Sequence, residues 1–333
     1  MSKIKICICG AGNMAHALIA YTANNDKYEF NILSSKNENW TEIKGYDEEL
    51  VISTGSVNLV TKDASLVIPD SDIIILTVPI FARKKLLKKI SPFVKEGVLL
   101  GAFPGVAGFD IEVEKYIKND SINIFSTQRV PYISRIIEKG EKVNATPKDS
   151  INVAILKNKN IVKTLLEDIL KIKVNVLDNF MEVNLSNSNP ILHTSRIYSL
   201  FKDLKKETAF KKEILFYENW NDDASEILLK MDKEFMLIVK KNRLKNVKSL
   251  KKHYEVSNVR EMTSKITSIH SFKGIKLPMI SNLDGSFKPD IESRYFTEDF
   301  KYGLKFIENA AKILNIETPL ISKVLNWSHN FIK

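Results

Sequence analysis

A glycine-rich segment near the N-terminus has the residue types and spacing needed to bind a dinucleotide. It reads G-x-G-x-x-A, directly after the apolar run KIKICIC and directly before an apolar helical stretch. The first glycine permits a tight turn, the second lets the backbone approach a pyrophosphate, and the small third residue lets helix and strand pack closely. Free N–H groups at the helix start would then face the phosphate charge. The predicted cofactor-binding residues of this turn are Gly10, Gly12, Asn13, Met14 and Ala15.

The turn after the second expected strand bears on the choice of dinucleotide. The strand covers residues 29–33 and is followed by Ser34, Ser35 and Lys36. Enzymes that prefer NAD tend to place Asp or Glu here, where the carboxylate accepts hydrogen bonds from the ribose hydroxyls. Two hydroxyls and an ammonium group can instead hold a 2′-phosphate, which a carboxylate would repel. The turn therefore favours NADP over NAD, and an ordinary polar turn is the alternative.

Two segments in the second half carry candidate catalytic and binding side chains. Asn189 and Pro190 suit the cap and first turn of a helix, which places His193 one turn inside that helix. Residues 292–299 are rich in ionisable and hydroxylic side chains, and Asp299 suits the start of the helix that follows. On pattern alone, a structural histidine and a charged surface loop are the alternatives.

Strands alternate with helices over residues 1–180, and this order predicts the architecture that positions these groups. Apolar strands are expected at residues 72–78, 97–103, 153–156 and 174–177, with helices at 82–90 and 161–172. The pattern predicts an α/β, Rossmann-like, doubly wound parallel sheet that forms a dinucleotide-binding domain. Val78 and Pro79 end one of its strands and join the predicted cofactor site. Residues 181–333 predict an all-α domain, with helices at 192–204, 224–241, 302–314 and 320–331.

Several longer motifs together resemble the opine dehydrogenase family, which includes octopine and nopaline dehydrogenases. In the first half these motifs are GAGNMAHA from Gly10, TVP at 77–79, GAFPG at 101–105 and TQRVPYISR at 127–135. In the second half they are NPxxH at 189–193, RYFTEDxxxGL at 294–304, and Thr318-Pro319 with Trp327. This chain is short for the family and carries a lysine-rich segment at 240–253, so the amino acid that it uses stays open.

The resemblance implies an activity and a set of site residues. It implies that the amine of an amino acid condenses with a 2-oxo acid such as pyruvate, and that hydride from NADPH or NADH reduces the resulting imine. The family's catalytic histidine and its aspartate partner correspond here to His193 and Asp299. Proton transfers during imine formation suit a histidine that titrates near neutrality. Because both substrates carry carboxylates, guanidinium clamps are expected. The predicted substrate-binding residues are Arg196, Arg294, Arg135 and Asn189.

Composition and charge limit the classes of partner. The chain has 50 Lys and Arg against 40 Asp and Glu, a net charge of +10. The excess is mostly lysine in the second half, whereas a nucleic-acid binder would concentrate arginine and aromatic residues in a stripe. No stretch approaches the roughly 18 apolar residues of a membrane span, and the histidines show no metal-ligand spacing. Two cysteines suit a reducing compartment. We therefore expect a cytoplasmic enzyme for small molecules, without metal, nucleic-acid or membrane partners, for which a homodimer is one option.

Two other functions stay open. A 2-oxo acid dehydrogenase of the same two-domain plan, such as a ketopantoate reductase, would need a lysine-centred site at the first helix of the second domain. This chain has His193 there. A non-catalytic NAD(P)-binding regulator would tolerate the loss of His193 or Asp299, and both are present.

Overall fold

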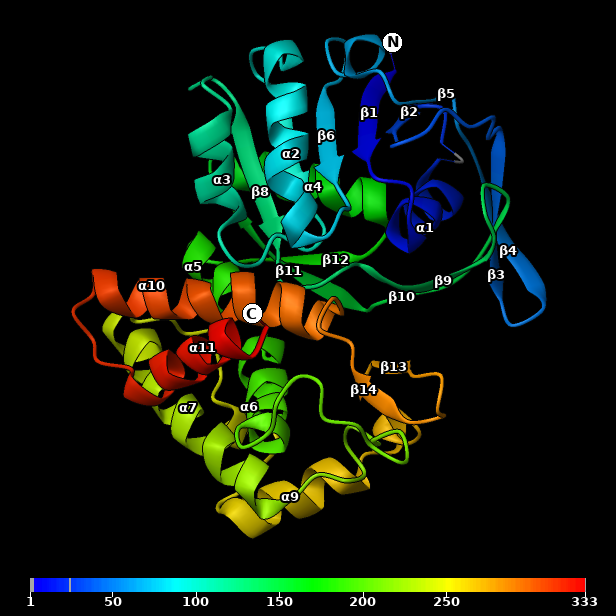
Figure 1. The fold of residues 1–333 in the computed structure, drawn as a ribbon. Helices are drawn as coiled ribbons and strands as arrows, with labels where there is room; N and C mark the ends of the chain where they lie inside the picture. The colour runs from blue at the N-terminus through cyan, green and yellow to red at the C-terminus, as the bar shows by residue number, and fades with distance from the viewer. Residues whose placement is uncertain (1–2, 24, 333) are drawn as a thin grey trace. The chain divides into compact units, whose positions relative to one another are not determined.

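The computed structural model describes residues 3–23 and 25–332, and it divides into two compact units (Figure 1). Unit 1 is Met1–Asn184 and unit 2 is Leu185–Lys333. The division falls four residues after the boundary expected at residue 180. None of the helices in the described ranges is long and apolar enough to cross a membrane.

Unit 1 is built on an eight-stranded sheet with the order β12-β11-β8-β7-β6-β1-β2-β5. Its strands are β1 (Ile4–Cys9), β2 (Tyr28–Leu33), β5 (Leu59–Thr61), β6 (Ile73–Leu76), β7 (Leu99–Ala102), β8 (Asn123–Thr127), β11 (Ser150–Ile155) and β12 (Lys173–Val176). Strand β1 pairs in parallel with both β2 and β6, so the strand order reverses beside β1. In doubly wound sheets, ligands bind at the carboxyl ends of the strands at such a reversal.

One pairing departs from the predicted parallel sheet. Strand β11 runs antiparallel to β8, and β12 then pairs in parallel with β11. The chain leaves β8 through the hairpin β9 (Tyr132–Glu138) and β10 (Lys142–Pro147) before it returns as β11. No helix crosses over between β8 and β11, and a parallel return normally needs such a crossover.

Helices cover both faces of the large sheet, because side chains of the central strand point alternately to each face. Ile6 and Ile8 of β1 pack in one buried apolar cluster, whereas Cys7 and Cys9 pack in the other. Both cysteines are free and buried, so they pack as small core residues. The helices of this unit are α1 (Asn13–Thr22), α2 (Ile80–Ile90), α3 (Phe109–Tyr116), α4 (Lys159–Leu170) and α5 (Phe180–Asn184).

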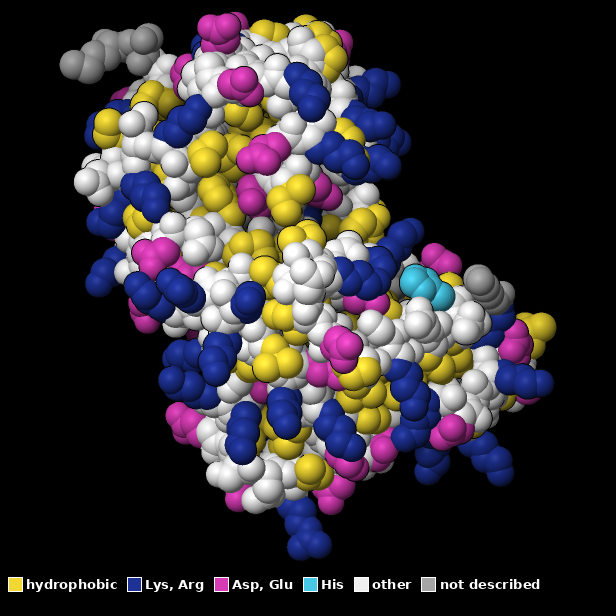
Figure 2. Space-filling view, turned by 90° about the vertical axis from the view of Figure 1, so that its left-hand side faces the viewer, with side chains coloured by type: hydrophobic (Ala, Val, Ile, Leu, Met, Phe, Trp, Pro, Cys, Tyr) yellow, Lys and Arg dark blue, Asp and Glu magenta, His cyan; other side chains and the backbone are white. Residues whose placement is uncertain are grey.

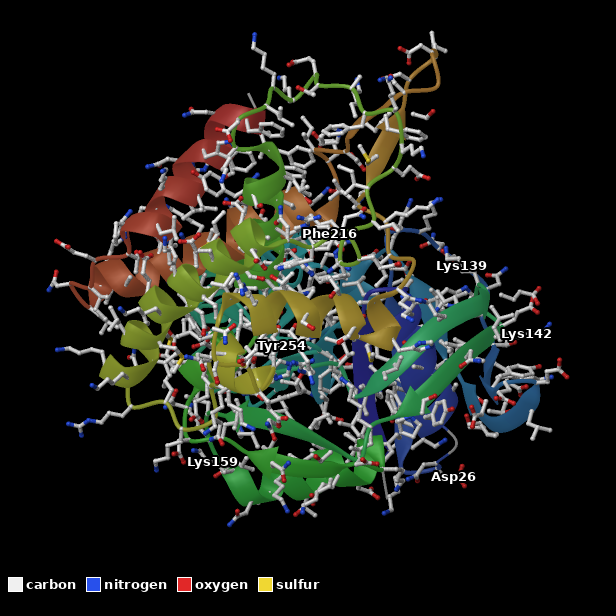
Figure 3. The ribbon with its side chains drawn as sticks, turned by 90° about the horizontal axis from the view of Figure 1, so that it is seen from below. Asp26, Lys139, Lys142, Lys159, Phe216 and Tyr254 are labelled. Carbon is white, nitrogen blue, oxygen red and sulfur yellow. The ribbon has the colours of Figure 1, made fainter. Side chains whose placement is uncertain are left out.

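A second sheet, which the sequence analysis did not predict, lies against α1. Its order is β4-β3-β10-β9, with β3 (Glu42–Asp47) and β4 (Leu50–Ser56) as the other hairpin. Lys139 lies in the turn between β9 and β10 and Lys142 begins β10 (Figure 3). This sheet ties to the glycine turn, since the Ile136 N–H donates to Asn13 Oδ1 at 2.8 Å.

Unit 2 is mainly helical. Its helices are α6 (Asn189–Phe201), α7 (Asp222–Lys241), α8 (Leu250–His253), α9 (Val259–Ser268), the π-helix η4 (Tyr295–Leu304), α10 (Lys305–Ile313) and α11 (Pro319–Ile332). The predicted all-α domain needs one correction, because β13 (Met279–Ser281) and β14 (Phe287–Pro289) form a small antiparallel hairpin. Asn282 and Ser286 close its turn by hydrogen bonding, and such polar turn residues carry no helical periodicity.

The lysine-rich segment 240–253 becomes the end of α7, a loop and α8. Buried Asp232 of α7 accepts hydrogen bonds from the N–H groups of Leu250 and Lys251, and so holds α8 in place. Figure 2 shows basic side chains distributed among acidic ones over the visible face, without one continuous stripe. Most residues of the segment 240–253 are exposed, so a solvated helix face and loop describe it.

Candidate active site

The glycine turn of unit 1 has the geometry of a phosphate-binding loop. Gly10 has φ +133°, and a Cβ there would lie 2.5 Å from Thr77 Oγ1 and 3.2 Å from Val78 Cγ1. No larger residue fits this turn, which brings the end of β6 against the end of β1. A Cβ on Gly12 would meet nothing within 4 Å, so the space in front of the helix start is open.

The start of α1 leaves donors available to an anion. Gly12 is the N-cap residue, no side chain caps the helix, and its first turn has no acidic residue. The first N–H groups of any helix lack intrahelical partners. Ala15 is fully buried between helix and sheet, as its small size predicts. The open space at Gly12 and these donors fit a dinucleotide pyrophosphate.

Two polar side chains of α1 hold the turn instead of facing the open space. Asn13 Oδ1 accepts from Ile136 N–H, as described above, and a cofactor contact of this residue stays a prediction. His16 is buried and bridges Gly12 O, at 2.9 Å from Nδ1, to the Gly140 N–H, at 2.8 Å from Nε2. Burial lowers the pKa of His16. A neutral His16 therefore links the turn to the β9–β10 hairpin.

The turn after β2 divides into a buried and an exposed part. Ser34 is buried, its N–H donates to Thr61 O, and its Oγ accepts from Lys36 N–H at 3.3 Å. Ser35 and the Lys36 side chain are exposed. Ser34 therefore shapes the turn, whereas Ser35 and Lys36 present their side chains to solvent.

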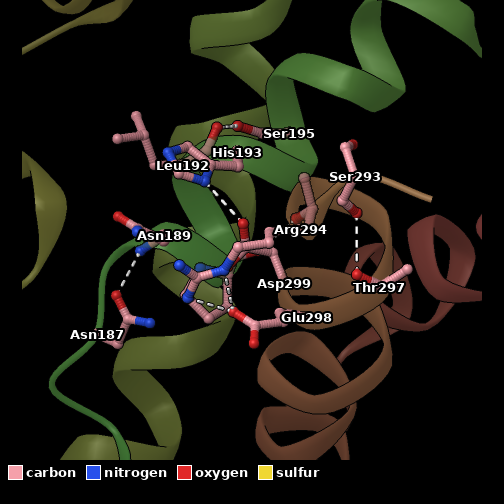
Figure 4. A network of polar contacts seen from close by, with 12 residues as sticks. Asn187, Asn189, Leu192, His193, Ser195, Ser293, Arg294, Thr297, Glu298 and Asp299 are labelled. Carbon is pink, nitrogen blue, oxygen red and sulfur yellow. Dashed lines mark hydrogen bonds and ion pairs between the residues drawn. The ribbon is translucent and has the colours of Figure 1, made fainter. Parts of the chain in front are cut away.

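In unit 2, the structure brings His193 and Asp299 together. His193 Nδ1 lies 2.8 Å from Asp299 Oδ2 (Figure 4), and the two side chains are only 10% and 13% exposed. The predicted proximity is confirmed, although 106 positions separate the residues in the chain. Their catalytic role stays a prediction.

The close approach of two helices explains this contact. His193 lies on the second turn of α6, as predicted, but the N-cap is Ser188, and Asn189, the predicted cap, is the first residue of the helix. A Cβ on Gly303 of η4 would lie 2.4 Å from Pro190 Cγ, so only glycine lets η4 approach the start of α6 this closely. The π-helical winding of η4 also widens the local turn, a feature common at functional sites.

Aromatic rings and a tyrosine hydroxyl enclose the His193 ring. Tyr295 packs edge-on at 4.5 Å between ring centroids, and Phe216 packs edge-on at 5.6 Å. The Tyr217 hydroxyl lies 3.0 Å from His193 Nε2. Figure 3 labels Phe216 in this region of unit 2. Sequence analysis missed Tyr217 because it lies in a loop without a motif, and only the aromatic density of FYENW at 216–220 could have drawn attention to it.

The prediction that Arg196 clamps a substrate carboxylate is wrong. Its side chain is 1% exposed, and Nε donates to Phe216 O at 3.1 Å while Nη2 donates to Asn219 O. Nη1 lies 3.5 Å from Asn221 Oδ1, and the guanidinium stacks 5.6 Å from the Trp220 ring centroid. Burial lowers the pKa of Arg196 to about 10. Its donors are committed to residues 216–221, so Arg196 anchors the loop that carries Tyr217.

The other predicted substrate-binding residues have polar groups accessible to solvent. Arg294 is 76% exposed at the start of η4, where Nε and Nη2 donate to Glu298 Oε2 at 2.7 and 2.6 Å (Figure 4). Asn189 is exposed at the start of α6, and Arg135 is exposed on β9 of unit 1. The structure therefore groups Arg294 and Asn189 with the dyad inside unit 2.

Comparison with known proteins finds a family model for each half of the chain and relatives over nearly its whole length. Residues 176–332 match the family model described as NAD/NADP octopine/nopaline dehydrogenase, alpha-helical domain. The matches to characterised members extend over nearly the whole chain. Residues 176–332 thus carry the helical domain of the octopine/nopaline dehydrogenases, and the whole chain is similar to opine dehydrogenases. Residues 5–100 match the model for the coenzyme F420-dependent NADP oxidoreductases, in agreement with a Rossmann-like unit 1.

Individual family members agree with this assignment. Octopine dehydrogenase of Mizuhopecten yessoensis is 26% identical to this chain, and the alignment covers 99% of this chain and 90% of the relative. Opine dehydrogenase of Haliotis discus hannai is 27% identical over 98% of this chain and 89% of its own. A solved octopine dehydrogenase with NADH and pyruvate superposes with TM-score 0.85 at 22% identity, covering 99% and 89% of the two chains, and so shares the fold. The protein is thus an NAD(P)-dependent oxidoreductase of the opine dehydrogenase type.

Proposed function

We propose that this enzyme joins the amine of an amino acid to a 2-oxo acid such as pyruvate and reduces the imine with NAD(P)H. The product would be an N-(carboxyalkyl) amino acid. The observation that carries the proposal is the buried His193–Asp299 pair within the domain that defines the family. The names of the relatives, octopine, tauropine and opine dehydrogenases, support the same reaction class.

The dyad supplies the proton transfers that this reaction needs. Asp299 accepts a hydrogen bond from His193 Nδ1–H, which leaves Nε2 as the nitrogen that exchanges protons. The Asp299 carboxylate also stabilises the imidazolium when it forms. As the imidazolium, His193 can protonate the 2-oxo acid oxygen while the amine attacks. It can then take up the proton that the attacking nitrogen loses and pass it to the hydroxyl of the carbinolamine, which leaves as water. When bound, the nicotinamide supplies the hydride for the imine carbon.

We assign cofactor binding to unit 1 and the proton chemistry to unit 2. The pyrophosphate would bind at the open space beside Gly12 and the uncapped start of α1. Val78, which lies beside Gly10, would contact the part of the cofactor that carries the nicotinamide. Exposed Ser35 and Lys36, in place of a ribose-binding acid, support NADP as the preferred cofactor.

Substrate carboxylates would meet Arg294, with Asn189 and Arg135 as further contacts. Arg294 is exposed at the helix that carries Asp299, and Glu298 orients its planar fork. A fixed guanidinium suits bidentate binding of a carboxylate. The free thiols of Cys7 and Cys9 suit a reducing compartment, so we extend the proposal to a cytoplasmic enzyme, for which a homodimer is one option.

Oxidation of NADPH tests the proposal when it is followed with pyruvate, with a panel of amino acids, and with both together. An opine dehydrogenase requires both substrates. Oxidation with the 2-oxo acid alone, at the same rate as with the pair, would instead indicate a 2-oxo acid dehydrogenase.

A further inference from the structure

We propose that Tyr217 is a third member of the catalytic group and carries protons between His193 Nε2 and the reacting substrate oxygen. The inference rests on the proposed function, since it concerns the same proton transfers. It assigns a chemical role to a loop residue outside the motifs that define the site.

Both ring nitrogens of His193 have a hydrogen-bond partner. Nδ1 lies 2.8 Å from Asp299 Oδ2, and Nε2 lies 3.0 Å from the Tyr217 hydroxyl. Since the carboxylate accepts a hydrogen bond from Nδ1–H, Nε2 of the neutral ring carries no proton and accepts a hydrogen bond from the Tyr217 hydroxyl. A substrate that exchanges a proton with this nitrogen must therefore displace the hydroxyl or act through it.

The surroundings of Tyr217 favour a hydroxyl that stays in place. Its ring is 5% exposed and stacks on Phe272 with 4.0 Å between centroids and an interplanar angle of 17°. The preceding residue is fixed from two sides, because Phe216 O accepts from Arg196 Nε and Phe216 N–H donates to Ile275 O. The loop is thus bound to α6, which also carries His193.

The hydroxyl has the properties that a relay needs. Burial, together with nearby Tyr295, Tyr254 and Asp299, raises the pKa of Tyr217, so the group stays neutral and can donate and accept at once. The titratable groups that face it are His193 on α6, Tyr295 and Asp299 on η4, and Tyr254 after α8, which Figure 3 also labels. No lysine or arginine is among them, so the relay connects only acids and the imidazole.

The proposed step balances in atoms and charge. The Tyr217 O–H proton passes to the carbinolamine oxygen while the C–O bond breaks and its electron pair stays on that oxygen, forming water. The nitrogen lone pair forms the C=N bond, which gives an iminium ion. The phenolic oxygen takes the proton of His193 Nε2, so the imidazolium becomes neutral and the positive charge moves to the iminium.

Tyr217→Phe removes the hydroxyl and keeps the stacked ring. We expect kcat to fall about tenfold to a hundredfold, with KM for both substrates changed little, as for a lost proton carrier. In mixtures of light and heavy water, a plot of kcat against deuterium content should be curved for the unaltered enzyme, because two protons move in the relay. The same plot should be linear for the variant, in which only one proton moves. The matched control is Tyr198→Phe, which changes a buried tyrosine on α6 that packs on Trp327, and it should leave kcat unchanged.

A second measurement does not depend on turnover. The ¹⁵N resonance of His193 Nε2 should shift in Tyr217→Phe and stay in place in Tyr198→Phe. A Tyr217→Phe enzyme with normal or raised kcat, or with an unchanged Nε2 resonance, would overturn the relay while the proposed function stands. Absence of any two-substrate reaction in the unaltered enzyme would refute the proposed function and the relay together.

Discussion

Replacing Arg196 by methionine separates a loop anchor from a substrate clamp. Methionine keeps an unbranched side chain but removes the donors to Phe216 O, Asn219 O and Asn221 Oδ1. A buried carbonyl without a donor, here Phe216 O, costs about 1–3 kcal/mol, and each of the other two bonds contributes about 1 kcal/mol. Loss of the stacking on Trp220 adds about 0.5–1 kcal/mol.

The variant also has no guanidinium to desolvate, which offsets part of this loss. We therefore expect unit 2 to lose about 3 kcal/mol of unfolding free energy, the sum of these contributions less the offset. Equilibrium unfolding in urea, followed by tryptophan fluorescence, measures it, because Trp220 lies in the affected loop. Arg260→Met, at an exposed position of α9, is the matched control and should change the unfolding free energy little.

Kinetics on the folded Arg196→Met enzyme complete the test. Because the loop carries Tyr217, kcat should fall as in Tyr217→Phe, while KM for the 2-oxo acid changes little. Stability equal to that of the control, together with a strongly raised KM for the 2-oxo acid, would refute the anchor and return Arg196 to the role of clamp.

The remaining predictions concern the dyad, the cofactor, the clamp and acid stability. His193→Ala and Asp299→Asn should each lower kcat by about a hundredfold or more with cofactor affinity unchanged, and the double variant should lose little more; near-normal turnover in either would contradict the dyad. Titration should show NADPH binding about tenfold to a hundredfold more tightly than NADH, and Lys36→Asp should reverse the order, whereas equal affinities would remove this turn from the 2′ position. Arg294→Lys should raise KM for the carboxylate substrates with a smaller effect on kcat, since a point charge cannot replace the planar fork, and unchanged kinetics would shift the clamp to another residue. Burial raises the pKa of Glu308, but hydrogen bonds from Lys305, Lys312 and Ser322 outweigh it and lower the pKa to about 2. This carboxylate should therefore stabilise the fold by about 2 kcal/mol above pH 4.5 and lose that contribution as the pH falls to about 2; acid unfolding of Glu308→Gln, compared with the unaltered protein, measures it.

The nucleotide-binding part of the fold could be predicted because its signals are local. A continuous apolar strand, two glycines and a helix within twenty residues determine the turn at Gly10, and the structure agrees in strand, turn and helix. The β3–β4 and β9–β10 sheet could not be found in the same way. Its strands expose one face, as at Ile133 and Ile137 of β9, and their pairing joins segments almost a hundred residues apart.

The site in unit 2 shows where sequence reasoning ends. His193 and Asp299 were paired through the family resemblance, since nothing in their spacing indicates the approach of Gly303 to Pro190. The substrate contact predicted for Arg196 is wrong because the position of this residue on α6, one turn after His193, does not reveal which loop covers its side chain. A guanidinium next to a catalytic histidine has the same sequence signature whether it binds substrate or carbonyl oxygens of the chain.

The most direct test of the central claim follows the fate of the hydride. The enzyme is supplied with nicotinamide cofactor deuterated at the transferred position, with pyruvate and an amino acid, and the products are analysed by mass spectrometry. Our account predicts a secondary amine that contains both substrates' carbon skeletons, with one deuterium on the carbon derived from the pyruvate carbonyl. Deuterium found instead in a free 2-hydroxy acid, with no carbon–nitrogen product, would contradict it.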